Sequence, residues 1–331
     1  PKHTSKDKYL GAYVKPPLKG LFKWVSDLDF KSLYPSIVKT FLLSTETLVG
    51  RVACYQQLVA YTIAKALNID SLEYVRNELL PKYLQYDVRL LKDIESKSTV
   101  NLKSVEREYI DMEVEYYDLY VDKGFPSKFE NLRDLKGWLR DNNFCLLPNG
   151  LIVDQNKDNA IIAKVIDDIM QSREKYKKLM LANLERGNES LYNMYNVYQT
   201  AVKIINNSVY GATANEGFRL YNLDISEGIT TAGQLLIRTC SYLLNKFLNG
   251  KTQASQEKDY VITNDTDSII FTLEGVVDYS PVERDPEVLK KISAVSRECQ
   301  DYINESIYSV CRDMFYKYKT NRSNNFLTIK N

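Results

Sequence analysis

Residues 260–273 read Y-V-I-T-N-D-T-D-S-I-I-F-T-L, two runs of β-branched and aromatic residues on either side of a short acidic segment. This pattern is typical of a β-hairpin. Asp265 and Asp267 stand at its tip, and side chains two apart in an extended segment point the same way. Carboxylates on a stiff hairpin are suited to bind a hard cation such as Mg²⁺. The alternative is a solvated Asp-Thr-Asp turn, because Asp and Asn are favoured turn residues.

A second acidic candidate, Asp29, ends a strand-like run at residues 21–30 and is followed by F-K-S-L-Y-P-S-I-V. Pro35 is expected to change the direction of the chain there. The alternative is an ordinary strand-to-helix cap. If Asp29 meets Asp267, the pair can bridge two metal ions about 3.5–4 Å apart, which clamp the attacking and leaving oxygens of a phosphoryl transfer.

Two long helices are predicted in the middle of the chain, at about residues 159–186 and 189–214. Gly187 suits the end of the first helix and Asn188 the cap of the second, so the pair is expected to form an antiparallel hairpin.

Three further helical regions are predicted. Residues 51–145 show a mainly helical pattern with many charges and tyrosines. Residues 226–249 form another predicted helix, closed by Gly250, and residues 286–315 form a final amphipathic helix.

Polar side chains form facing strips on the helical hairpin: Arg173 and Lys177 on the first helix, and Lys203, Asn207, Tyr210 and Gly211 on the second. Residues three, four or seven apart share a helix face. Arg binds phosphate bidentately and Lys binds it as a point charge, so the strips are suited to hold a triphosphate and a base. The alternative is a solvated basic face, which is expected for Lys175 and Lys178.

The composition allows two coupled domains, because the chain has 331 residues and 44% of them are hydrophobic. No apolar run is long enough to span a bilayer and no secretory segment follows the basic start, so we expect no membrane contact and a cytoplasmic location. Five isolated cysteines and one histidine predict reduced thiols and no zinc site. The net charge of +1 neither favours nor excludes nucleic acid.

In their order along the chain, these elements resemble the motifs of B-family DNA polymerases, most closely the replicative polymerases of T-even-like bacteriophages. The three main likenesses are D-F-K-S-L-Y-P-S-I at 29–37 to motif A, K-I-I-N-N-S-V-Y-G at 203–211 to motif B and D-T-D-S at 265–268 to motif C. Weaker likenesses lie at residues 11–17, 147–150, 173–180 and 229–234. The resemblance covers most of the chain except about residues 51–140.

The resemblance implies an α+β fold, a right-hand polymerase palm built from an antiparallel sheet with packed helices and a helical-hairpin fingers domain. Residues 1–155 would be the first part of the palm, with a helical insertion at about 51–145. Residues 156–215 would be the fingers, and residues 216–331 the second part of the palm. No exonuclease domain and no thumb are expected in this chain. Separate polypeptides are expected to carry them, and the alternative is that the sequence is a piece of a longer protein.

The resemblance also implies how the substrate phosphates and metals are held. Asp29 and Asp267 would coordinate two Mg²⁺ ions, with the backbone carbonyl of Phe30 as a further ligand. Asp265 would be a less direct acidic neighbour. The side chains that would hold the triphosphate are Arg173, Lys177, Lys203 and Asn207.

A third set of residues is implied to contact the sugar and the base. Tyr34 would be the steric gate that excludes a 2′-hydroxyl, with Ser32 and Leu33 beside it, while Tyr210 and Gly211 would pack against the nascent base pair.

One position departs from the family pattern. The family usually has Tyr-Gly before D-T-D, whereas this chain has Thr263-Asn264. We expect Asn264 to tolerate the positive φ that a glycine suggests.

The implied function is DNA-directed DNA polymerisation in DNA replication, with dNTP added to a primer 3′ end on primer–template DNA. Two alternatives stay open. One is a primase or specialised repair polymerase on the same palm. The other is a non-catalytic scaffold subunit of a replication complex.

Overall fold

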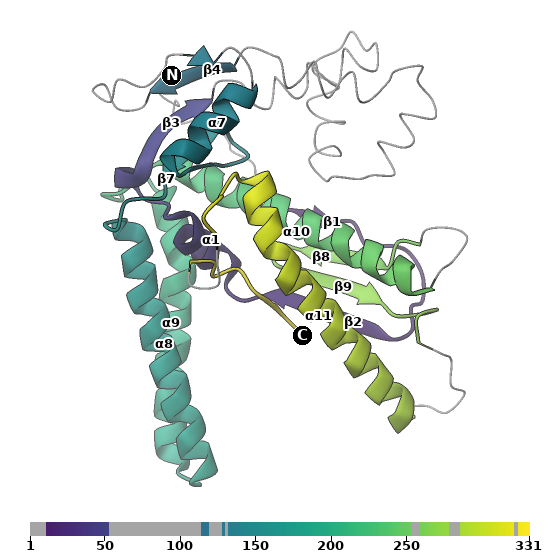
Figure 1. Cartoon of the computed structure of the whole chain (residues 1–331). Coiled ribbons are helices and arrows are strands. Elements are labelled where there is room, and N and C mark those ends of the chain that lie inside the picture. The colour runs from purple at the N-terminus through teal and green to yellow at the C-terminus, as the bar shows by residue number, and fades with distance from the viewer. Residues whose placement is uncertain are drawn as a thin grey trace, which may run out of the picture.

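The computed structural model describes residues 11–52, 114–118, 128–129, 132–252, 258–277, 285–320 and 324–331. Within these residues, two antiparallel sheets of five strands each are accompanied by long helices (Figure 1). The prediction of an antiparallel sheet with packed helices is therefore confirmed, and a second sheet is added to it.

The first sheet has the strand order β1-β8-β9-β2-β10. Its strands are β1 (Val14–Lys15), β8 (Val261–Asp265), β9 (Ser268–Thr272), β2 (Val25–Phe30) and β10 (Ile329–Lys330). β8 and β9 form the predicted hairpin, and β2 lies on the other side of β9. Along β2 the side chains alternate, so that Leu28 and Phe30 are buried while Asp27 and Asp29 reach solvent.

Helices α10 (Leu223–Thr252) and α11 (Pro286–Met314) pack against the first sheet, and α1 (Leu33–Phe41), which follows β2, packs against α10. The final helix was predicted almost to the residue. α10 is longer at both ends than the predicted 226–249, because the side chain of Asn222 accepts a hydrogen bond from the Ile225 backbone N–H at 3.0 Å and Gly250 does not end the helix.

The helices α8 (Ile161–Glu185) and α9 (Glu189–Thr213) form the predicted hairpin and project away from the sheets (Figure 1). Gly187 turns with φ 68°, a conformation that suits a residue without Cβ. The Asn188 side chain accepts a hydrogen bond from the Leu191 backbone N–H at 3.1 Å. The base of α8 is buried in the main core through Ile162 and Ile166.

The second sheet has the strand order β5-β4-β3-β7-β6 and packs with helix α7 (Leu132–Asn142). Its strands are β3 (Leu48–Val52, after the 3₁₀ helix Thr45–Thr47), β4 (Val114–Asp118), β5 (Lys128–Phe129), β6 (Phe144–Leu146) and β7 (Leu151–Asp154). The predicted helical pattern at about 51–145 is thus wrong for β4, for β5 and for the ends of β3 and β6 that fall in that range, and right for α7. Residues 53–113 lie outside the described part.

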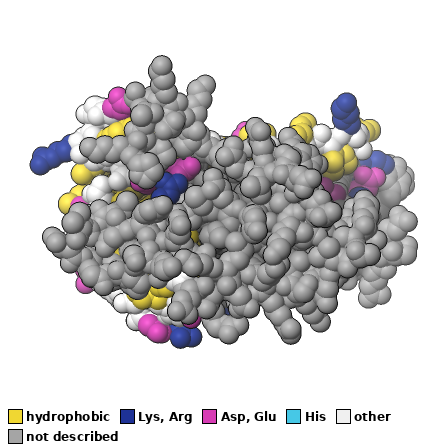
Figure 2. Space-filling model, turned by 90° about the horizontal axis from the view of Figure 1, so that it is seen from above, with side chains coloured by type: hydrophobic (Ala, Val, Ile, Leu, Met, Phe, Trp, Pro, Cys, Tyr) yellow, Lys and Arg dark blue, Asp and Glu magenta, His cyan; other side chains and the backbone are white. Residues whose placement is uncertain are grey.

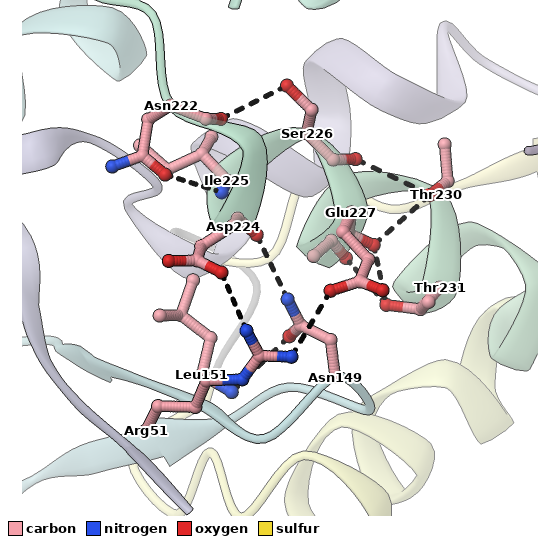
Figure 3. Close-up of polar contacts among 11 residues, drawn as sticks. Arg51, Asn149, Leu151, Asn222, Asp224, Ile225, Ser226, Glu227, Thr230 and Thr231 are labelled. Carbon is pink, nitrogen blue, oxygen red and sulfur yellow. Dashed lines mark hydrogen bonds and ion pairs between the residues drawn. The ribbon is translucent and has the colours of Figure 1, made fainter. Parts of the chain in front are cut away.

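A polar network joins this second sheet to the start of α10 (Figure 3). Arg51 on β3 donates to the carboxylates of Asp224, at 2.7 Å, and Glu227, at 3.4 Å. The Asn149 side chain donates to the backbone carbonyl of Asp224 at 2.9 Å. The guanidinium therefore neutralises two half-buried carboxylates that would otherwise repel each other.

We expect Arg51→Met to lower the free energy of unfolding by about 1–2 kcal/mol, because it leaves Asp224 and Glu227 close together without their shared cation. Urea denaturation at neutral pH measures the change. The matched control is Arg140→Met, whose partner Asp141 and own side chain are 68% and 64% exposed, so its effect should stay within about 0.5 kcal/mol. Equal effects of the two variants would contradict the role of the network.

The described cysteines are Cys145, Cys240, Cys299 and Cys311, all free and buried. Burial raises the pKa of the Cys145, Cys299 and Cys311 thiols to about 12. These thiols are protonated at neutral pH. That all four described cysteines are free and buried agrees with the prediction of reduced, mostly structural cysteines for this part of the chain.

The described surface is mixed in charge where Figure 2 shows it, with Lys and Arg side chains close to Asp and Glu and no continuous basic patch among the coloured residues. Within the described ranges, no helix combines the length and the apolar character needed to cross a membrane.

Candidate active site

A cavity of about 570 Å³ lies where the first sheet, α1 and the α8–α9 hairpin meet. It is lined by eleven of the thirteen predicted site residues: Asp29, Phe30, Ser32, Leu33, Tyr34, Arg173, Lys177, Lys203, Asn207, Tyr210 and Asp267. These residues come from four separate regions of the sequence, and the fold gathers them around one space.

The two carboxylates of the cavity, Asp29 and Asp267, come from neighbouring segments of the first sheet. Asp29 pairs with Ser268 across β2 and β9, and the next backbone N–H, of Phe30, donates to the Asp267 carbonyl at 2.8 Å. Burial of Asp267 and, after it, the negative charge of Asp29 raise the pKa of the Asp267 carboxyl. Two carboxylates held this close favour binding of a cation between them.

Asp265 is not brought into the cavity. It ends β8 as an exposed residue, and its carboxylate accepts a hydrogen bond from the Thr266 hydroxyl at 3.0 Å. Thr266 has φ 56°, so the segment from Asp265 to Asp267 is a turn rather than an extended strand. The expectation that both side chains point the same way is therefore wrong, although Asp265 still contributes to raising the pKa of Asp267.

The positive φ expected at Asn264 is also displaced to Thr266, because Asn264 is a regular residue of β8. The Asn264 side chain is buried and donates to the Ser241 hydroxyl at 3.0 Å and to the Ser268 carbonyl at 3.3 Å. The hairpin thus forms with Asn264 as an anchor to α10.

The turn between β2 and α1 forms the next part of the wall. Its change of direction occurs at Ser32, with φ 53°, whereas Pro35 occupies the first turn of α1, where its missing N–H is tolerated. The Phe30 ring is buried in the core, with 1% of the residue exposed, so its main chain is the part that can face the cavity.

The α8–α9 hairpin supplies the cationic wall, with Arg173 and Lys177 from α8 and Lys203 and Asn207 from α9. The Arg173 Nε is buried and has no hydrogen-bond partner within the described part of the chain. A buried donor of this kind is costly unless a ligand satisfies it. A phosphate oxygen is the matching acceptor.

The aromatic rings of Tyr34 on α1 and Tyr210 on α9 contact each other. The centroids of Tyr34 and Tyr210 are 4.8 Å apart and the ring planes are tilted by 50°. Leu33, beside Tyr34, is buried, with 3% exposed. Gly211 does not line the cavity, and a Cβ added to it would meet nothing within 4 Å, so no contact within the described protein requires a glycine there.

Five lining residues were not among the predicted site residues: Lys31, Pro35, Glu174, Thr266 and Lys330. Lys330 pairs with Asp29 across β10 and β2, and its Nζ lies 3.5 Å from the Asp29 carboxylate. No motif spacing signals this residue, because its place depends on the pairing of β10 with β2.

The donor set fits Mg²⁺ bound together with phosphate groups. Among the described residues, no group of three or more His, Cys, Asp and Glu side chains could form a metal cage by itself. Mg²⁺ is commonly held by one or two carboxylates together with substrate phosphates and water. Asp29 and Asp267, facing a cationic wall suited to phosphate, match that arrangement.

The chain is similar in sequence to known DNA polymerases. The chain is 27% identical over 289 residues to the DNA-directed DNA polymerase of Escherichia phage RB69, and the match covers 82% of this chain and 27% of that protein. It is 24% identical over 288 residues to the DNA-directed DNA polymerase of Enterobacteria phage T4, covering 84% of this chain and 28% of the relative. It is 24% identical over 302 residues to the DNA polymerase of Thermococcus gorgonarius, and this match covers 91% of this chain and 25% of that protein.

The chain therefore spans about a quarter of the length of these relatives. The family model described as DNA polymerase family B matches residues 1–111 and 130–311, which is most of the chain. By this match, the chain belongs to DNA polymerase family B.

Proposed function

We propose that this chain carries the catalytic centre of a DNA-directed DNA polymerase, which adds dNTP to a primer 3′ end by two-metal nucleotidyl transfer in DNA replication. The observation that supports this most is the shared cavity, in which Asp29 and Asp267 from the first sheet face Arg173, Lys177 and Lys203 from the helical hairpin. Carboxylates on one side and cations on the other suit two metals and a triphosphate.

In this proposal, residues 1–155 and 216–331 form the palm, and residues 156–215 form the fingers. The proposed partners are primer–template DNA and dNTP, in the cytoplasm of a host cell. A pull-down from the native source tests the expectation that separate polypeptides supply the exonuclease and thumb.

The side chains that line the cavity have two roles in this proposal, metal binding and triphosphate binding. Asp29 and Asp267, with the main chain of Phe30, hold the metals, which when bound activate the primer 3′-hydroxyl and neutralise the pyrophosphate. Arg173, Lys177, Lys203 and Asn207 bind and orient the triphosphate for in-line attack.

The sugar and base contacts complete the proposed site. The Tyr34 ring excludes a 2′-hydroxyl by steric clash. Tyr210 packs against the nascent base pair, with Gly211 next to it on α9, and Ser32 and Leu33 are next to the Tyr34 ring. Asp265 acts only indirectly, through its charge near Asp267.

Primer extension tests this function. The purified chain, with Mg²⁺, dNTPs and a primer–template, should lengthen the primer, whereas a scaffold subunit adds no nucleotide. A primase would start new strands on the template without a primer. Failure to extend any primer while still forming a specific complex with DNA would favour the scaffold.

Metal binding can be measured apart from activity by thermal unfolding of Asp267→Asn. Burial and the charge of Asp29 raise the pKa of Asp267 in the folded state above its ordinary value of 3.8. As the pH rises from 3.8 through this raised pKa, the carboxyl loses its proton and the folded state loses stability. At neutral pH without metal, Asn should therefore raise Tm by about 1–3 °C, a small gain because the group is half-buried and screened by solvent. Mg²⁺ with dNTP should stabilise the wild type and no longer stabilise the variant.

The control for this measurement is Asp301→Asn, an exposed residue of α11, which should change neither Tm nor the stabilisation by Mg²⁺ with dNTP. Full retention of that stabilisation by Asp267→Asn would count against Asp267 as a metal ligand.

A further inference from the structure

Gly233 of α10 lies directly against the ring of Tyr34. A Cβ added to Gly233 would lie 3.0 Å from the Tyr34 Cε1 atom, 3.5 Å from Leu33 Cδ2 and 3.6 Å from Ile37 Cδ1. Contacts of 3.4–4 Å are ordinary, so the two aliphatic side chains could accept the new atom. The contact with the Tyr34 ring is too short and requires a shift of a few tenths of an ångström.

The surroundings decide which group moves. α10 is packed on both sides of Gly233, where Ala232 and Leu236 are completely buried. Leu33 and Ile37 are also buried in the core, so the base of α1 is fixed. The Tyr34 ring is only half-buried, lines the cavity and touches Tyr210. The ring is therefore the part that yields, and the cavity is the open space into which it can move.

We propose that Gly233 is a specificity-determining position, whose missing side chain sets how far the Tyr34 ring reaches under the sugar of the incoming nucleotide. This inference rests on the proposed function, and in particular on Tyr34 as the group that excludes the 2′-hydroxyl. Gly233 contacts no substrate in this account, and acts by positioning Tyr34. A side chain at residue 233 pushes the ring into the cavity and leaves less room at the 2′ position.

The experiment compares single-nucleotide insertion of dNTP and rNTP by Gly233→Ala. The ratio of kcat/KM for dNTP to kcat/KM for rNTP should rise by about fivefold or more, because the displaced ring clashes more strongly with a 2′-hydroxyl than with hydrogen. The matched control is Gly228→Ala. Its new Cβ would lie 2.9 Å from Leu147 Cδ1, so it adds a similar clash to the same helix away from the cavity. Both changes favour the helix equally, and the control should leave the ratio unchanged.

A double variant separates this inference from the proposed function. Tyr34→Ala should lower the dNTP-to-rNTP ratio, and Gly233→Ala added to it should cause no further change, because the ring is gone. If Tyr34→Ala leaves the ratio unchanged, the role of Tyr34 fails and the inference fails with it. If Tyr34→Ala lowers the ratio while Gly233→Ala behaves like Gly228→Ala, only the inference is overturned.

If Gly233→Ala folds poorly, thermal unfolding of the variant with and without Tyr34→Ala tests the proposal. If the ring is the obstacle, any loss of Tm caused by Gly233→Ala should disappear in the Tyr34→Ala background. An equal loss of Tm in both backgrounds would show that the new methyl group clashes with the core instead, and would overturn the proposal.

Discussion

Asp267→Asn should slow primer extension by at least about 10³-fold, because the variant keeps the shape of the side chain and removes the negative charge that holds the metals. Burial and, after it, the negative charge of Asp29 raise the pKa of Asp267, and that neighbouring charge also favours a cation bound close to both carboxylates. Asp29→Asn should have an effect of similar size, since both side chains line the same cavity. Single-turnover insertion at saturating Mg²⁺ and dNTP measures the chemical step.

The matched control is Asp27→Asn. Asp27 precedes Asp29 by two residues on β2, and its pKa is raised by burial and by the charge of Asp29, but it does not line the cavity. Its removal should change the extension rate by less than about threefold. If Asp27→Asn lowers the extension rate as much as Asp267→Asn does, the rate depends on the total negative charge of this region and not specifically on Asp29 and Asp267.

Lys203→Met should lower kcat/KM for dNTP by about 10²–10³-fold, because it removes a cation from the wall that faces the substrate phosphates. The side chain of Met has a similar length, so the helical hairpin should keep its structure. Charge develops on the leaving pyrophosphate during transfer, and we therefore expect kcat as well as KM to change. Steady-state single-nucleotide insertion over a range of dNTP concentrations gives both parameters.

Lys175→Met is the matched control for this change. Lys175 is exposed on α8 and does not line the cavity, so its loss should leave kcat/KM for dNTP within about twofold. Equal losses in the two variants would point to a general effect of positive charge on DNA binding, which a strong dependence on salt concentration would reveal.

The helical hairpin and the β8–β9 hairpin were predictable because their signals are local. Gly187 supplies the turn and Asn188 the cap of the next helix, and the sequence on either side has apolar residues at helical spacing. The Asp-Thr-Asp hairpin is likewise defined by adjacent runs of β-branched residues. The hypothesis that Asp267 and Asp29 bind metal ions together could therefore be drawn from the types of these residues and the order of their motifs.

The second sheet could not be predicted in the same way. Its strand β3 pairs with β4 and with β7, and these strands are far apart in the sequence, so each one gains its stability from partners that its own residues do not specify. β4 and β5 belong to a sequence region whose overall pattern favours helix, and at their own residues strand pairing overrides that preference.

Residue types and their order, together with the family resemblance that they carry, thus predicted that Asp29, Asp267, Arg173 and Lys203 act together, and all four line one cavity. Only the tertiary structure decided how they lie in space. Asp265, before a left-handed turn at Thr266, is exposed and does not line the cavity; strand pairing brings Lys330 to Asp29, and helix packing sets Gly233 against Tyr34. The physical reason is that register and packing join segments distant in the chain, whereas motifs report only on near neighbours.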